Sequence, residues 1–419
     1  MNSPSFRSDF LRVMSERGFL NQCTDLEGLD AKLSSGEVSA YVGYDMTAKS
    51  LHIGNLISLM MLRWLQKTGH RPILLTGTAT TKVGDPTGKS EQRPLLTDAQ
   101  IATNKSHIRT VFERLVSYTG PRAAIEVDNI DWLSKLGYIE FLRDYGVNFT
   151  INRMLSFESV KMRLDREEPM TFLEFNYMLM QAVDYLELYR SHGCVLQMGG
   201  ADQWGNILNG VELTRRMAGA QVFGMTSLLL LNSAGAKMGK TLAGAVWLNA
   251  EQFSPYDYWQ FWRNCDDADV GKLLKLFTEL PMDEIARLER LEGAEINEAK
   301  KILADEATAL VHDRDAANAA RAAAQSAFET AGKLSSDLPT LEVPRHEIEA
   351  GLPLANLVAR AGLAKSNSEA RRLASGGGVR LNDAVISDAG ILVEPGHCDA
   401  DGIIKLMVGK KRLVLVRIV

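Results

Sequence analysis

The hydrophobic and polar positions of this 419-residue chain change their period along its length. From about residue 38 to residue 250, short apolar runs such as SAYVGYD and RPILLTGTAT alternate with longer amphipathic runs such as LHIGNLISLMMLRWLQKTG. This alternation is typical of βαβ units, in which helices connect the strands of a parallel sheet. We therefore predict an α/β domain with a parallel sheet over residues 1–250.

The pattern beyond this domain predicts two smaller ones. Residues 251–331 are charged and Ala-rich with helical periodicity, which predicts a helical domain. Ser, Asp and Pro cluster in residues 332–348 without a clear period, so we predict a linker there. Residues 349–419 begin with the helix-like runs PLANLVARAGL and SNSEARRLA and end with the strand-like run KRLVLVRIV, which predicts a small α+β domain.

Composition and charge exclude several classes of protein. Hydrophobic residues make up 46% and charged residues 24%, as in soluble globular proteins. The net charge of -5 argues against nucleic-acid binding through overall basicity, so any such contact must use a local patch. The chain has no apolar run of membrane-spanning length and no apolar leader at its start, and its four cysteines are widely spaced. We predict a cytoplasmic protein with reduced thiols, no structural zinc and no membrane partner.

Residues 84–90, GDPTGKS, look like a phosphate-binding P-loop. A true P-loop has four residues between its glycines, so that successive backbone N–H groups wrap a phosphate, but this segment has three. Pro86 also lacks an N–H group. An ordinary loop and a loop that lines a substrate site of another kind both remain open.

A stronger candidate for phosphate binding lies where YVGYDMT is followed by LHIGNL. The pattern predicts a strand, a short loop and a helix whose first turn carries His52 and Asn55 on one face. Gly54 leaves room for a ligand to approach the backbone, and a helix N-terminus attracts phosphate through free N–H groups and its dipole. The alternative is that His52 only caps the helix.

Two segments carry a resemblance to a known family. The run His52-Ile53-Gly54-Asn55 resembles the HIGH signature of class I aminoacyl-tRNA synthetases, with Asn55 replacing the second histidine. Further along, residues 237–241, KMGKT, resemble the mobile KMSKS loop of the same class. Either segment alone is weak evidence, but the two together in this order are specific.

A third group of residues points to one subgroup of that class. Tyr177, Gln181 and Asp184 follow i, i+4, i+7 spacing, so they form a polar stripe on a Met- and Leu-rich helix, and such a stripe must face solvent or line a site. Gln197, followed by Asp202 and Gln203, marks a strand-to-helix turn, where open α/β sheets bind ligands. From about residue 8 to its end, the chain resembles the tyrosyl-tRNA synthetases of bacterial or organellar type.

The resemblance implies a fold and an activity. The parallel sheet should be Rossmann-like, with a helical insertion at about residues 120–170 that forms a homodimer interface. The enzyme should activate tyrosine with ATP to tyrosyl-adenylate and pyrophosphate, and then transfer the tyrosyl group to the 3′ end of tRNA(Tyr). Mg²⁺ should accompany ATP. The tyrosine carboxylate is already a nucleophile, so the protein's task is alignment and stabilisation of charge on the phosphates.

The resemblance also implies roles for individual residues. Tyr41 and Asp184 should hold the phenol. The full tyrosine-binding set is Tyr41, Thr80, Asp85, Tyr177, Gln181, Asp184 and Gln197. The implied contacts to ATP or the adenylate come from Gly43, Asp45, Thr47, His52, Gly54, Asn55, Asp202, Gln203 and Lys240. The implied catalytic residues are His52, Asn55, Lys89, Arg93, Lys237, Lys240 and Thr241. Val42 stands where many relatives have cysteine, which removes an expected ribose contact.

The C-terminal segment resembles an S4-type RNA-binding domain through LPLANLVARAGLAKSNSEARRLASGGGVRLN. Its candidate RNA contacts are Lys365, Arg371 and Arg372, with Arg360 and Arg380 nearby, because guanidinium groups grip phosphates. The alternative is a basic face that is merely solvated.

Two other functions for the whole chain remain open. A tryptophanyl-tRNA synthetase would share the architecture, although an indole would not need Tyr41 opposite Asp184. A non-catalytic RNA-binding protein with a degenerate synthetase body is disfavoured by the intact His52, Lys237 and Lys240.

Overall fold

The computed structural model of the chain describes residues 6–87, 95–233, 235, 237–241, 244–329, 339–382, 384–388, 390–399, 402–409 and 412–419. The chain divides into two compact units. The larger unit contains residues 1–239, 247–253 and 262–312, and the smaller unit contains residues 240–246, 254–261 and 313–419. No helix in the described ranges is long and apolar enough to cross a membrane.

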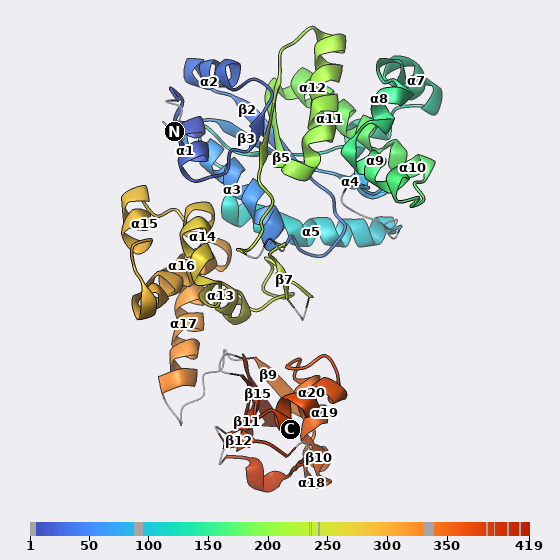
Figure 1. Cartoon of the computed structure of the whole chain (residues 1–419). Helices are drawn as coiled ribbons and strands as arrows, with labels where there is room; N and C mark the ends of the chain where they lie inside the picture. Colours follow the sequence, from blue (N-terminus) through green and yellow to red (C-terminus); the bar gives the residue numbers. More distant parts are fainter. Residues whose placement is uncertain are drawn as a thin grey trace. The chain divides into compact units, whose positions relative to one another are not determined.

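A six-stranded sheet with strand order β1-β6-β5-β2-β3-β4 forms the centre of the larger unit (Figure 1). Its strands are β1 (Gln22–Cys23), β2 (Ser39–Tyr44), β3 (Arg71–Thr76), β4 (Ile125–Asp128), β5 (Cys194–Gly200) and β6 (Phe223–Ser227). Strands β2 to β6 pair in parallel, which confirms the predicted α/β fold class. One edge of the sheet differs, because β1 pairs antiparallel with β6. This two-residue strand comes from the N-terminal segment and needs no crossover helix.

Helices cover both faces of this sheet. Figure 1 shows α3 (Ile53–Lys67) and α5 (Asp98–Leu115) on one side and α11 (Tyr177–His192) and α12 (Trp204–Ala218) on the other. The interior strands are therefore buried on both faces and read as continuous apolar runs. In β3, for example, Ile73, Leu74 and Leu75 are all buried.

The terminal helices of the larger unit pack mainly on α3 and α5. The N-terminal pair is α1 (Asp9–Glu16) and α2 (Leu26–Ser35). The C-terminal set is α14 (Val270–Phe277), α15 (Met282–Leu288) and α16 (Ile296–His312). Helix α13 (Pro255–Arg263) has residues in both units. The buried Arg17 connects the two sets: its guanidinium donates to the carbonyl oxygens of Lys275, Thr278 and Leu280 and lies over the ring of Trp64.

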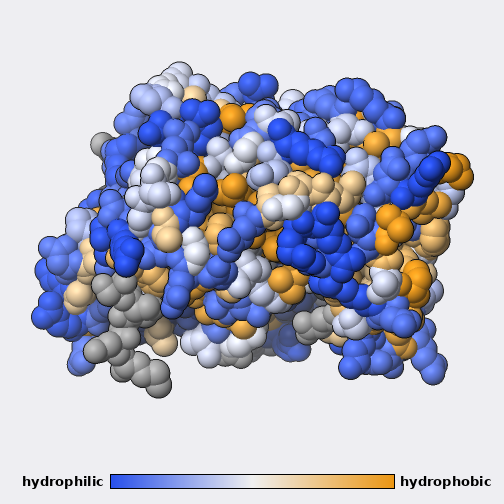
Figure 2. Space-filling view, turned by 90° about the horizontal axis from the view of Figure 1, so that it is seen from above, coloured by the Kyte–Doolittle hydropathy of each residue, from blue (hydrophilic) through white to orange (hydrophobic). Residues whose placement is uncertain are grey.

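A helical insertion stands between β4 and α11, as the resemblance implies. Its helices are α6 (Ile130–Leu133), α7 (Tyr138–Asp144), α8 (Ile151–Leu155), α9 (Glu158–Asp165) and α10 (Phe172–Phe175). Inside it, Arg163 and Glu174 form a buried ion pair with an N–O distance of 2.9 Å. Its surface carries exposed apolar side chains, among them Tyr138, Ile139, Val147, Ile151 and Phe172. Figure 2 shows hydrophobic patches on its right side, where Figure 1 places α7–α10.

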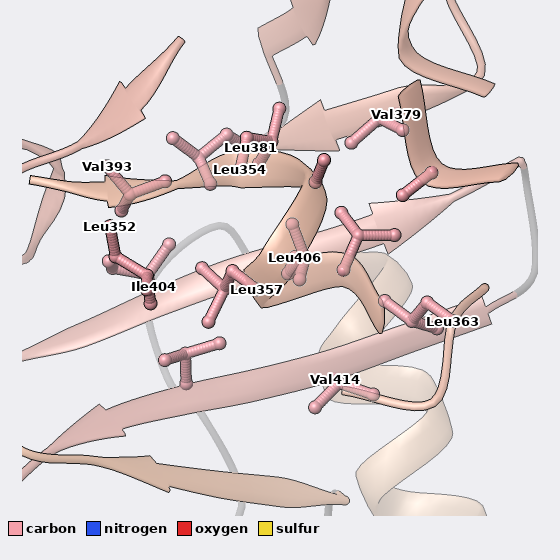
Figure 3. Close-up of a cluster of buried hydrophobic side chains, with 14 of the residues drawn as sticks. Leu352, Leu354, Leu357, Leu363, Val379, Leu381, Val393, Ile404, Leu406 and Val414 are labelled. Carbon is pink, nitrogen blue, oxygen red and sulfur yellow. The ribbon is translucent and has the colours of Figure 1, made fainter. Parts of the chain in front are cut away.

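The smaller unit contains α17 (Arg314–Glu329) and an α+β domain. The sheet of this domain has strand order β12-β11-β14-β15-β9, from β9 (Thr340–Val343), β11 (Val379–Leu381), β12 (Ala384–Ile386), β14 (Ile403–Val408) and β15 (Arg412–Ile418). Two helices, α19 (Leu354–Arg360) and α20 (Asn367–Ser375), pack through apolar residues such as Leu357 against Leu406 and its neighbours (Figure 3). Two-stranded pairs are formed by β7 (Lys240–Thr241) with β8 (Gly244–Ala245), and by β10 (Leu352–Pro353) with β13 (Leu392–Val393).

The structure differs from the sequence pattern within residues 332–348, where we expected a linker. Residues 340–343 form β9, which pairs in parallel with β15, and α18 (Arg345–Glu349) follows. The reason is the alternation of Leu341 and Val343, which turn toward the core of the domain, where Val343 is fully buried.

Candidate active site

Polar side chains gather at the carboxyl ends of the parallel strands, where open α/β sheets bind ligands. Asp45 directly follows β2, Thr80 lies in the short helix α4 (Thr78–Thr81) after β3, and Gln203 follows β5. Gly43 is exposed although Val42 and Tyr44 on either side of it are buried. One face of β2 is therefore open at this point.

A buried carboxylate forms the innermost part of the site. Asp184 on α11 is 2% exposed and accepts hydrogen bonds from Nδ2 of Asn129 at 3.0 Å and from Nε1 of Trp132 at 2.8 Å. Burial raises the pKa of Asp184 to about 7, against the opposing effect of these two donors. Asp45 and Asp128 raise the pKa of Asp184 further through their negative charge.

Tyr41 on β2 belongs to the same buried region. Its side chain is fully buried, and its hydroxyl group has no hydrogen-bond partner. Burial raises the pKa of Tyr41 well above its usual value, and the nearby charge of Asp184 acts in the same direction. The Tyr41 hydroxyl is therefore a neutral group that can donate to or accept from a ligand beside Asp184.

Asp45 links this buried region to α11 and α4. Its carboxylate accepts a hydrogen bond from Oγ1 of Thr80 at 2.7 Å and another from the hydroxyl of Tyr177 at 2.9 Å. Oγ1 of Thr80 in turn accepts from Nδ2 of Asn129 at 3.0 Å. Asp45, Thr80, Asn129 and Asp184 thus belong to one hydrogen-bonded network.

A second chain of hydrogen bonds runs between α11 and the loop after α4. Nε2 of Gln203 donates to Asp85 at 2.8 Å, and Nε2 of Gln181 donates to Oε1 of Gln203 at 3.2 Å. The polar stripe expected at positions 177, 181 and 184 of α11 is therefore directed toward groups that follow β2, β4 and β5.

Three buried polar atoms at this site lack a hydrogen-bond partner: the hydroxyl of Tyr41, Oε1 of Gln181 and Oε1 of Gln197. Gln197 on β5 pairs with Tyr41 on β2 in the register of the sheet. A buried polar atom left without a partner costs about 1–3 kcal/mol. A ligand that supplies polar groups at these three positions would recover part of that cost.

The first turn of α3 is more exposed than this region. His52 is the N-cap of the helix: its Nδ1 accepts from the backbone N–H of Gly54 at 3.0 Å, while Oδ1 of Asn55 accepts from the backbone N–H of His52 at 3.2 Å. His52 therefore caps the helix, and its contact with phosphate stays a prediction. A Cβ atom at Gly54 would lie 2.8 Å from Cε1 of His52, so glycine permits this arrangement. Thr47 is half-buried in the loop that leads from β2 to α3.

The second signature approaches the first at Gly239. This residue has φ of 92°, and a Cβ atom there would lie 2.7 Å from Cγ1 of Ile53, the first residue of α3. Lys237 is exposed, and its positive charge opposes the rise in the pKa of Asp202 that desolvation and Asp85 cause. Lys240 and Thr241 form β7, which the division of the chain assigns to the smaller unit. Lys89 and Arg93 lie outside the described residues.

The candidate RNA contacts are exposed in the smaller unit. Lys365 precedes α20, and Arg371 and Arg372 lie within it. Arg380 is exposed on β11, whereas Arg360 forms an ion pair with Glu347.

Sequence reasoning missed Asn129 and Trp132, the two donors to Asp184. The available signal was the position of Asn129 directly after β4, at the same edge of the sheet as Asp45. Polar residues at the end of a parallel strand are candidates for a site in their own right.

Comparison with known proteins agrees with this geometry. A family model described as class I tRNA synthetases (W and Y) matches residues 33–329, and a model of the S4 domain matches residues 352–397. The tyrosine–tRNA ligase of Caulobacter sp. (strain K31) is 62% identical over 99% of this chain and 98% of its own length. The chain belongs to the tyrosine–tRNA ligase family of class I tRNA synthetases.

Other members of the family and solved structures extend the comparison. The tyrosine–tRNA ligase of Xanthobacter autotrophicus is 57% identical over the full length of both chains. A C-terminally truncated mitochondrial tyrosyl-tRNA synthetase of Aspergillus nidulans superimposes with a TM-score of 0.70 at 30% identity, over 77% of this chain and 95% of that one. A tryptophanyl-tRNA synthetase of Encephalitozoon cuniculi shares the fold, with a TM-score of 0.54 at 13% identity over 74% of this chain and 87% of that one.

Proposed function

We propose that this protein is a tyrosine–tRNA ligase, which activates L-tyrosine with ATP and transfers the tyrosyl group to the 3′ end of tRNA(Tyr). The observation that carries the proposal is the buried carboxylate of Asp184, with two donors on one side and the unpartnered hydroxyl of Tyr41 nearby. A phenol can donate to Asp184 and accept from Tyr41 at once. The indole of tryptophan has a donor only, so it would leave the Tyr41 hydroxyl without its acceptor.

The other polar groups suit the ends of an amino acid. Asp85, Tyr177 and Gln181 supply a carboxylate, a hydroxyl and an unpartnered amide oxygen for the ammonium group. Thr80 donates a hydrogen bond to Asp45, which also accepts from Tyr177, so Thr80 helps to position Tyr177. Gln197 is the proposed contact to the substrate carboxylate.

The first step needs alignment rather than a general base. The substrate carboxylate attacks the α-phosphorus of ATP, the bond to the bridging oxygen breaks, and pyrophosphate leaves with the electron pair. His52 and Asn55 hold the first turn of α3, whose N-terminus attracts phosphate. Lys237, Lys240 and Thr241, with Lys89 and Arg93, would stabilise charge that develops on the phosphates. Mg²⁺ enters as part of the nucleotide substrate.

The adenylate has its own set of proposed contacts. The open face of β2 at Gly43, together with Thr47 and Gly54, would let the nucleotide lie against the backbone. Asp45, Asp202 and Gln203 are the proposed polar contacts to the ribose or the reacting groups. In the second step a ribose hydroxyl at the tRNA 3′ end takes the tyrosyl group and AMP leaves.

Binding of tRNA(Tyr) would use the S4 domain as well as the active site. Lys365, Arg371 and Arg372 are exposed around α20 and can meet phosphate groups. A chain shortened to end near residue 333 should still form tyrosyl-adenylate but charge tRNA poorly. Full charging by a folded shortened chain would exclude the S4 domain as the tRNA clamp.

We also propose a cytoplasmic homodimer. The insertion exposes Tyr138, Ile139, Val147, Ile151 and Phe172, each at least 60% exposed, and a group of exposed apolar side chains is typical of a protein–protein interface. Sedimentation should give about twice the chain mass of 46.2 kDa at micromolar concentration. A fully active monomer would contradict this part of the proposal.

The test of the function is ATP–pyrophosphate exchange with the full-length protein. Exchange should depend on tyrosine, with tryptophan and phenylalanine as poor substitutes. Exchange driven by tryptophan would favour the related synthetase, and its absence with every amino acid would favour a non-catalytic RNA-binding protein.

A further inference from the structure

An ion pair outside the substrate site connects α5 to the end of β4. Nζ of Lys105 lies 2.7 Å from Oδ2 of Asp128. The Lys105 side chain is 37% exposed, while that of Asp128 is only 12% exposed. Asp128 is not among the residues that the sequence or the resemblance assigned to the site.

Asp128 also fixes the start of α4 to the turn after β4. Its carboxylate accepts from Oγ1 of Thr78 at 2.6 Å, from the backbone N–H of Thr78 at 3.3 Å and from the backbone N–H of Ile130 at 3.1 Å. With Lys105, this one carboxylate receives four donors from three segments of the chain. Such a saturated carboxylate is a rigid junction.

The next residue, Asn129, repeats this connection at the substrate site. Its Oδ1 accepts from the backbone N–H of Ala79 in α4 at 2.8 Å, and its Nδ2 donates to both Thr80 and Asp184. Trp132, in α6, provides the other donor to Asp184 and ends the segment 128–132, which we call the 128–132 turn. The turn that Asp128 fixes therefore carries both donors that orient Asp184.

We propose that the Lys105–Asp128 pair is a positioning pair that determines selectivity for the phenol of tyrosine. It holds the 128–132 turn so that Asn129 and Trp132 saturate one side of Asp184 and leave the other side for the substrate hydroxyl. The inference rests on the proposed function, in which Asp184 reads that hydroxyl. Neither Lys105 nor Asp128 is assigned a contact with the substrate.

Loss of this pair should affect the selectivity for tyrosine over phenylalanine more strongly than the general activity. Without Lys105 the mostly buried charge of Asp128 loses its positively charged partner, and the turn can relax toward other donors or water. Small displacements of a supporting group are enough to weaken a reactive or binding geometry. Phenylalanine has no hydroxyl for Asp184 to bind, so its use should depend little on how Asp184 is oriented.

The experiment compares Lys105→Met and Asp128→Asn with wild type, and uses Arg109→Met as the matched control. Arg109 lies one turn further along α5 and also approaches β4, with its Nε 3.7 Å from Glu126, but its ion pairs do not include the 128–132 turn. Asparagine at position 128 keeps an acceptor for the backbone donors, which guards against loss of the fold. Lys105→Arg restores the positive charge.

The readout is kcat/KM in ATP–pyrophosphate exchange, measured with tyrosine and with phenylalanine that has been freed of contaminating tyrosine. KM for ATP and the unfolding temperature are measured alongside. We expect Lys105→Met and Asp128→Asn to lower kcat/KM for tyrosine about 10-fold and that for phenylalanine less than about 3-fold, with KM for ATP unchanged. Lys105→Arg should recover most of the selectivity, and Arg109→Met should retain all of it.

Two results would overturn the proposal: an equal loss with both amino acids, which means that the pair only stabilises the fold, or no loss with either. Asp184→Asn in the same assay separates this failure from that of the proposed function. If that variant loses selectivity while Lys105→Met does not, Asp184 reads the phenol and the positioning pair is refuted. If wild type shows no tyrosine-dependent exchange, the proposed function itself fails.

Discussion

The phenol end of the site and the first turn of α3 are built in opposite ways. Asp184, Tyr41 and Asn129 are each no more than 2% exposed, and Asp184 already holds two donors before any substrate is bound. At the start of α3, His52 is exposed, and the hydrogen bonds that we describe for His52 and Asn55 cap their own helix. Lys237, in the nearby loop, is also exposed.

This difference separates two tasks that one active site must perform. A buried carboxylate with an acceptor position left for the substrate penalises any ligand that brings no donor to that position, so it suits discrimination between amino acids. Exposed cations and helix N–H groups contribute little to binding of the ground state, but they can stabilise negative charge that appears only as pyrophosphate departs. We therefore expect changes at the first region to alter selectivity and changes at the second to alter the rate.

The largest effect should come from Asp184→Asn. The amide would set its own N–H group against the donors Asn129 and Trp132, so that buried polar groups lose their partners. We expect kcat/KM for tyrosine in pyrophosphate exchange to fall by about 1000-fold, and the preference over phenylalanine to fall with it. Asp283→Asn, at an exposed aspartate on α15, is the control. If the ratio of kcat/KM for tyrosine to that for phenylalanine stays unchanged, Asp184 does not determine selectivity, and the role given to the buried region is refuted.

At the exposed end, Lys237→Ala should lower kcat for activation by about 10- to 1000-fold with little change in KM for tyrosine. The reason is that the lysine acts on charge that develops in the transition state. The same pattern is expected for Lys240→Ala. Lys32→Ala, on the exposed face of α2, should leave both constants unchanged. A loss confined to KM for tyrosine would refute the assignment of Lys237 to the transition state.

Tyr41→Phe should have a smaller effect than either change. It removes one neutral hydrogen-bond partner of the phenol and leaves no buried charge unpaired. It should therefore cost about 0.5–1.5 kcal/mol of discrimination between tyrosine and phenylalanine. The ratio of kcat/KM for tyrosine to that for phenylalanine checks this directly. A loss as large as that of Asp184→Asn would mean that the hydroxyl of Tyr41, and not the carboxylate, dominates recognition.

The smallest predicted effect is that of pH. Because burial raises the pKa of Asp184 to about 7, the carboxylate is charged above this pH and becomes a neutral acid below it. A neutral acid is a weaker acceptor, so the preference for tyrosine over phenylalanine should fall about 2- to 5-fold between pH 8 and pH 6. The Asp184→Asn variant should lack this step. The same step in that variant would assign the titration to another group.

The sequence predicts the sheet and the part of the site that lies near recognisable patterns. Period-2 and period-3.6 runs indicate the strands and helices, and the i, i+4, i+7 spacing identifies Tyr177, Gln181 and Asp184. The antiparallel pairing of β1 was not predictable, because a two-residue strand carries almost no periodic signal. The same holds for β9, whose short run of apolar and polar residues lies in a segment with the composition of a linker.

Asn129 and Trp132 show a second limit. Their relation to Asp184 is purely tertiary, because a turn after β4 meets a helix that begins almost fifty residues later in the chain. No spacing rule connects such positions. The burial of Asp184 implies that donors must exist somewhere, but only the fold identifies them.

The antiparallel edge strand β1 has a consequence for how the protein is made. Residues 22 and 23 leave the ribosome early, yet the partners that they pair with, residues 225 and 226, are synthesised only after the rest of the sheet. Until β6 is made, β1 has no partner and the edge of β5 stays open, and an open strand edge is a template for pairing with another nascent chain. The sheet can therefore close at this edge only after residue 227 has been synthesised, and we expect the growing chain to need protection from such pairing until then.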